Sequence, residues 1–86
     1  MGADLRRMDL SSVDLTAANL TGANLTGANL RSSDLTSVDL TDAKLTDADF
    51  RGAYLGKANL TGADLRGANL KSADLREAKM PDSFIP

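Results

Sequence analysis

Large apolar residues recur at every fifth position of this chain. Leucine holds most of these positions, and the others are Phe50, Met80 and Ile85. An α-helix would rotate successive leucines by about 140°, because it has about 3.6 residues per turn. A single β-strand would place successive leucines on opposite faces, because side chains alternate and five is an odd number. Neither regular element therefore keeps the leucines together.

The residues between the leucines complete a repeat of the form Ala-(Asp/Asn)-Leu-(Thr/Arg)-(Gly/Ser/Asp). The small residue and the leucine are two positions apart, so both point to the same side of a short extended segment. The Asp or Asn between them points outward, and the Gly, Ser or Asp that follows favours a turn. The sequence therefore predicts a closed coil that turns a corner every five residues. Leucine and alanine lie inside, and neighbouring coils stack about 4.8 Å apart through backbone hydrogen bonds.

The motif A(D/N)LXX, repeated from Ala3 to about Met80, resembles the pentapeptide-repeat family. The resemblance implies an all-β fold, a right-handed quadrilateral parallel β-helix with four pentapeptides in each coil. On that basis the chain makes about four coils and a rod about 20 Å long, given the spacing between neighbouring strands. The hand and the four-sided section follow from the resemblance, whereas the closed coil follows from the residues.

Residues 1–80 are predicted to form the solenoid, and residues 81–86 a C-terminal cap or tail. Pro81 and Pro86 lack backbone donors and so discourage further stacking. Phe84 and Ile85 are expected to fold over the end of the core. The N-terminal end shows no such cap, which makes it a candidate surface for a homodimer formed by end-to-end stacking. A longer parent protein would give the same open end.

Stacking of residues twenty apart gives a map of the surface. Arg31, Arg51 and Lys71 form one basic column, a candidate strip for binding an anion or a partner. The alternative is a solvated face on which neighbouring Arg and Asp neutralise one another. Tyr54 is the outsider in a column of aspartates on the next face. An exposed aromatic is an interface candidate, although single exposed apolar residues are common.

The composition argues against an enzyme. The chain has no His and no Cys, so the usual activated serine and cysteine systems are missing. Its carboxylates form ladders on a convex surface, where nothing predicts a cleft that would shift their pKa values. The pair Asp47 and Asp49 lacks the glycine-rich signature of calcium-binding β-rolls, and no glycine-rich phosphate loop is present. We therefore predict no catalytic residue, no metal and no cofactor.

Three functions follow from this sequence. The first is a non-catalytic structural or protein-interaction module. The second comes from the resemblance, since some pentapeptide-repeat proteins mimic DNA and inhibit or protect DNA gyrase. That role needs a long acidic rod, and here ten Lys and Arg nearly balance twelve Asp and Glu. The third is ice binding, for which the threonine column Thr21, Thr41 and Thr61 is narrow. With a net charge of −2, no direct binding of nucleic acid is expected.

Nothing in the sequence suggests attachment to a membrane. No apolar run approaches the length needed to span a bilayer, and no signal or transit peptide is visible. We therefore expect a soluble protein, cytoplasmic by default. If a transit peptide has been removed, the thylakoid lumen is the alternative that the family resemblance implies.

Overall fold

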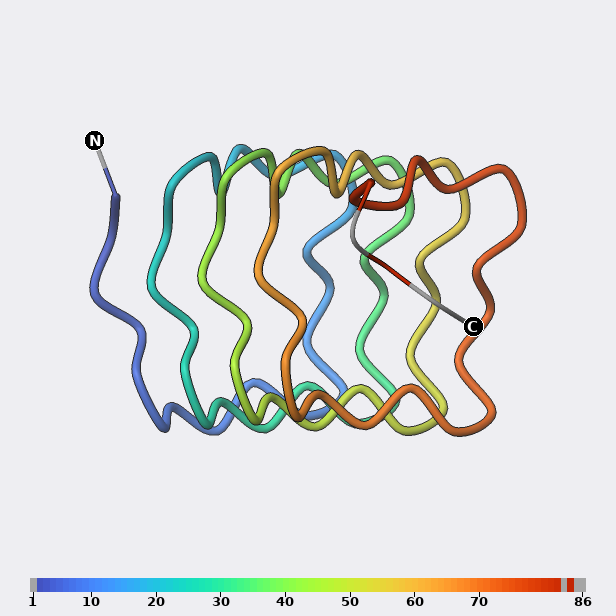
Figure 1. Ribbon diagram of the computed structural model, residues 1–86. Coiled ribbons are helices and arrows are strands. Elements are labelled where there is room, and N and C mark those ends of the chain that lie inside the picture. The colour runs from blue at the N-terminus through green and yellow to red at the C-terminus, as the bar shows by residue number, and fades with distance from the viewer. Residues whose placement is uncertain (1, 83, 85–86) are drawn as a thin grey trace.

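The computed structural model describes residues 2–82 and 84, and Figure 1 shows the chain winding as a stack of coils. Within these residues no segment forms a helix or a continuous strand. Instead, two-residue turns alternate with single parallel β-bridges that join residues twenty apart, from Asp4–Asn24 to Asn59–Lys79. Four pentapeptides therefore complete one coil, which confirms the predicted four-sided stack.

The backbone explains why the coils stack so regularly. In the repeat around Leu30, the N–H of Leu30 donates to the carbonyl of Asp49 in the next coil at 2.8 Å. The N–H of Ser32 also reaches the next coil, and the N–H of Asn29 reaches back to Met8 at 2.9 Å. Each inner coil is thus bonded to both neighbours, as buried backbone groups require.

The core is a column of leucines and alanines along the axis of the stack. The two middle coils are fully enclosed, whereas the first and last coils keep their leucines partly exposed. Phe50 is the largest buried side chain. Its N–H still donates to Asn69 at an ordinary 2.8 Å, so the ring does not disturb the stacking. Its own coil has room for it, because the small position is alanine in all four repeats: Ala43, Ala48, Ala53 and Ala58.

Each corner is a tight turn whose second residue has a positive φ. Ten such residues are not glycine, with φ between 58° and 63°, and five are glycine. A positive φ at the second central position alone is the pattern of a type II turn. An L-residue in this region costs about 1–2 kcal/mol relative to the right-handed region. The repeat therefore carries a small strain at most of its corners.

Replacing Ala17 with glycine is expected to stabilise the protein by about 0.5–1 kcal/mol, because it removes that strain at a modest cost in chain entropy. Ala17 has a φ of 60° and its side chain is exposed. Urea unfolding measures the change. The mirror-image control is Gly22→Ala, where an added Cβ meets only ordinary contacts. Movement of both variants in the same direction would contradict the strain argument.

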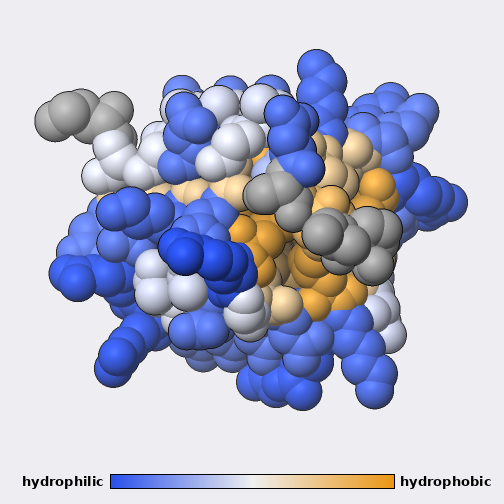
Figure 2. Space-filling view, viewed as in Figure 1, coloured by the Kyte–Doolittle hydropathy of each residue, from blue (hydrophilic) through white to orange (hydrophobic). Residues whose placement is uncertain are grey.

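The two ends of the stack differ. At the C-terminal end, Pro81 is buried and Phe84 is half-buried, and both line a hollow of about 660 Å³ beside Leu65. Figure 2 shows apolar side chains exposed on this side of the molecule. Ile85 lies outside the described residues, so the capping role of residues 81–86 stays a prediction.

At the N-terminal end, Met8 is 43% exposed and Val13 is 36% exposed. Both occupy the inward small position that is mostly alanine in the later coils. The backbone of the described residues extends 25 × 23 × 23 Å, so the stack is nearly as wide as it is long. The end surfaces are consequently as large as any side face.

Candidate interaction surface

The outward Asp and Asn side chains mostly form hydrogen bonds within the turns. Every repeat with Asp or Asn before its central residue has that side chain accepting from the N–H two residues later, as Asp49 Oδ1 does from Arg51 N at 3.1 Å. We call this contact the Asx bond. It gives the N–H of the fourth residue of the repeat a partner and holds the side chain against its face.

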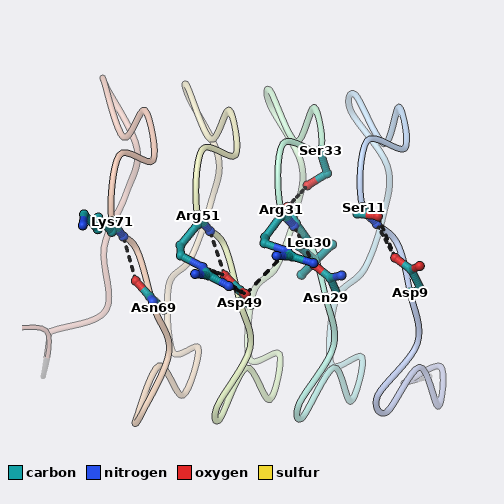
Figure 3. Close-up of polar contacts among 10 residues, drawn as sticks. All are labelled: Asp9, Ser11, Asn29, Leu30, Arg31, Ser33, Asp49, Arg51, Asn69 and Lys71. Carbon is teal, nitrogen blue, oxygen red and sulfur yellow. Dashed lines mark hydrogen bonds and ion pairs between the residues drawn. The ribbon is translucent and has the colours of Figure 1, made fainter.

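The three basic residues Arg31, Arg51 and Lys71 do share one column, together with Ser11 of the first coil (Figure 3). We call these three residues the basic strip. Arg51 pairs with the carboxylate of Asp49, with Nη2 at 2.7 Å from Oδ2. Arg31 reaches the same carboxylate more loosely, at 3.7 Å. No ion pair of Lys71 occurs among the described residues, so the strip is only partly neutralised by its own face.

Hydrogen bonds from arginine keep several outward carboxylates charged. The Arg76 side chain lowers the pKa of Asp74 to about 2, and Arg66 does the same for Asp64. At Asp49 the Arg51 side chain is again the largest cause of the lowered pKa. These carboxylates remain ionised under all ordinary conditions, which suits ladder positions rather than proton transfer.

Asp74 is expected to titrate near pH 2 in the folded protein. Its folded pKa lies below the ordinary value of 3.8, so its contribution to stability is complete above about pH 4 and is lost as the pH falls through 2. In the variant Arg76→Gln the largest cause disappears, and the midpoint should rise toward 3.8. Carboxyl NMR shifts report the midpoint. Arg51→Gln, on another face, should leave Asp74 unchanged; an equal shift there would refute the local cause.

Tyr54 lies on the next face, so the structure does not bring it into the basic strip. Parallel bridges place it between Asp34 and Asp74, and its side chain is 53% exposed. Sequence reasoning missed the residue beside it. Gly56 follows the central leucine, where the other repeats have Thr, Ser, Arg, Lys or Pro. Gly56 and Tyr54 both line an open hollow of about 500 Å³.

Nothing in the described part of the chain resembles a metal site. Within residues 2–82 and 84, no three carboxylates gather closely enough to hold an ion. The same residues form no helix long and apolar enough to cross a membrane.

The stack of four-sided coils and the five-residue motif define the class of protein. The family model described as pentapeptide repeats matches residues 2–27, 14–52 and 43–80. The chain belongs to the pentapeptide-repeat family, whose solved members form right-handed quadrilateral β-helices. No catalytic function is indicated for the family by these matches.

Solved structures agree with this assignment. A pentapeptide repeat protein from the thylakoid lumen of Arabidopsis thaliana has a TM-score of 0.77 at 32% identity, over 79% of this chain and 47% of its own. A pentapeptide repeat protein from the cyanobacterium Nostoc has a TM-score of 0.57 at 35% identity, over 95% of this chain and 77% of its own.

A third similar structure is HetL, also from Nostoc, a pentapeptide repeat protein involved in regulating heterocyst differentiation. It is 38% identical with a TM-score of 0.50, over 96% of this chain and 43% of HetL. The chain thus spans about half the length of the Arabidopsis protein. No curated protein matches the sequence significantly.

Proposed function

We propose that this protein is a non-catalytic interaction module that binds another protein. The observation that carries the proposal is the way the repeat uses its own polar groups. Most backbone N–H groups of the described residues are bonded between coils, within turns or to outward Asp and Asn side chains. The result is a rigid support whose remaining outward side chains stand in fixed columns, and flat columns of fixed side chains suit recognition of a surface.

The basic strip is the part of the surface that we propose for an acidic partner. Lys71 has no ion pair among the described residues, and Arg31 only a long one at 3.7 Å. Positive charge held at regular spacing attracts a negatively charged surface and fixes its orientation. The narrow threonine column gives no comparable support to the ice-binding alternative. The nearly cubic shape gives none to the DNA-mimic alternative.

Capture from a cell extract tests this function. The immobilised wild-type protein should retain a reproducible partner, and Arg51→Glu should lose it. The matched control is Arg66→Glu, because Arg66 pairs with Asp64 at 2.6 Å much as Arg51 pairs with Asp49, but on another face. Equal loss in both variants would mean that the strip is not the binding surface. Failure of the wild type to retain any partner would count against the function itself.

We also propose that two copies associate through their first coils. Support comes from Met8 and Val13, whose apolar side chains are exposed on that end. Light scattering after size-exclusion chromatography, over a concentration series, should show a dimer that Met8→Lys converts to a monomer. A wild-type monomer at all concentrations would overturn this arrangement.

A further inference from the structure

The repeat 53–57 differs from its neighbours at two outward positions at once. Tyr54 stands where an Asp or Asn usually accepts the Asx bond, and Gly56 stands where a Thr, Ser or Arg usually lies. The hydrogen bonds of the described residues include none from the N–H of Gly56. The repeat therefore lacks both the acceptor and the side chain that fill this place in most other repeats.

The fold does not require glycine at position 56. Its φ is not positive, unlike that of the corner glycines. A Cβ added there would meet the Arg76 carbonyl at 3.7 Å, an ordinary contact. Gly56 instead forms part of the wall of the hollow of about 500 Å³ beside Tyr54, and it adds no side chain there. The repeat around Lys44 also lacks the acceptor, but Thr46 keeps its side chain there.

The place where the acceptor is missing, at Tyr54, lies between two carboxylates. Asp34 and Asp74 occupy the same position in the coils on either side. Asp74 pairs with Arg76 at 2.7 Å. Asp34 Oδ1 accepts from the N–H and hydroxyl of Thr36, and its second oxygen has no hydrogen bond among the described residues. The position thus offers one open N–H donor and one open carboxylate acceptor, beside an exposed aromatic ring.

The same molecule shows which group fits such a position. In the neighbouring column, Asn29 lies between Asp9 and Asp49, and its Oδ1 accepts from the N–H of Arg31 at 3.1 Å. A carboxamide can accept from an N–H and donate to a carboxylate at once. A carboxylate in that position would be repelled by two like charges. A cation has no acceptor to offer the N–H.

We propose that the Tyr54–Gly56 hollow is a docking site for a partner polypeptide that inserts an Asn or Gln side chain. The inserted carboxamide takes the place of the Asp or Asn side chain that this repeat lacks. Its oxygen accepts from the Gly56 N–H, its nitrogen donates to Asp34, and its aliphatic part packs on the Tyr54 ring. This site rests on the proposed interaction function and assigns it a second, chemically distinct contact.

Titration with small amides, followed by NMR, tests the site directly. The probes are the N-acetyl methylamides of glutamine, glutamate and alanine, and the readouts are the Gly56 amide and Tyr54 ring signals. The glutamine compound should shift both signals saturably and bind at least about tenfold more tightly than the other two, a difference of about 1.4 kcal/mol. Equal binding of the alanine compound would indicate recognition of main-chain amides and overturn the proposal, as would tighter binding of the glutamate compound.

The double variant Tyr54→Asn/Gly56→Thr is the matched control. It copies the repeat of Asn59 and Thr61, so its own carboxamide fills the position and the fold should be kept. Amide signals far from the site should stay in place while the glutamine compound no longer binds. Absence of any saturable shift in the wild type would also overturn the site. That failure leaves the capture experiment on the basic strip unaffected, so the two proposals fail separately.

Discussion

Replacing Phe50 with alanine is expected to destabilise the protein by about 3–5 kcal/mol, the usual cost of removing a buried aromatic side chain. Phe50 is fully buried in the third coil, and the alanines around it cannot refill the space. A small domain has a total stability of about 5–15 kcal/mol, so this single change approaches global unfolding. Urea unfolding followed by circular dichroism measures the loss.

The control at the same position is Phe50→Leu, which restores the residue found at most other central positions. A swap between apolar residues of similar volume usually costs less than about 1.5 kcal/mol, and leucine keeps most of the volume of phenylalanine. A second comparison is Leu70→Ala in the last coil, where the leucine is only partly buried and the loss should be smaller. Equal losses for Phe50→Leu and Phe50→Ala would mean that the ring fits the core specifically and that its volume alone does not explain its contribution.

Proline at Asn59 is expected to be far more costly than proline at Asn19. The two asparagines occupy the same column, follow an alanine, and make equal Asx bonds of 3.1 Å to Thr61 and Thr21. They differ in the backbone, because the N–H of Asn59 donates to the Val38 carbonyl at 2.9 Å. Asn19 lies in the first coil, and its N–H has no partner among the described residues. Leaving the Val38 carbonyl without a donor should cost about 1–3 kcal/mol.

Alanine variants at both positions separate the effect of the backbone hydrogen bond on stability from that of the side chain. Asn59→Ala and Asn19→Ala remove only side-chain bonds: the Asx bond at both sites, and at Asn59 also the bond from the Thr61 hydroxyl. The difference between proline and alanine at each site therefore reports the backbone bond. Urea midpoints give these differences. If proline costs as much stability at Asn19 as at Asn59, strain from the proline ring outweighs the backbone hydrogen bond to Val38. That result would contradict the expectation drawn from the hydrogen bonds.

The architecture of the protein could be predicted from the sequence because one short rule repeats without interruption. The five-residue period places Leu30 and Ala28 inside and Asn29 outside, and a coil of four repeats fixes which residues stack. The basic column of Arg31, Arg51 and Lys71 followed once the family resemblance supplied four repeats for each coil. The inward and outward positions depend only on backbone periodicity, which packing does not alter.

Other features depend on departures from the rule and on neighbours twenty residues away. The hollow at Gly56 arises because Tyr54 and Gly56 differ together, and a single glycine within a glycine-rich repeat does not stand out. The sharing of Asp49 between Arg51 and Arg31 depends on side-chain conformations. Strain at the corners could not be predicted from the sequence either, because residues such as Lys57 adopt a positive φ that their identity does not suggest.

The bridges between residues twenty apart also determine how such a protein can change in length during evolution. Duplication of one complete coil lengthens the stack and leaves every column aligned. Duplication of a single pentapeptide, in contrast, moves all later residues onto the adjacent face. After an insertion between Arg51 and Lys71, for example, Lys71 would leave the basic strip while the core pattern remained intact. Duplication of whole coils therefore conserves the surface columns, whereas duplication of single pentapeptides conserves only the core. New surface faces can consequently arise without loss of the fold.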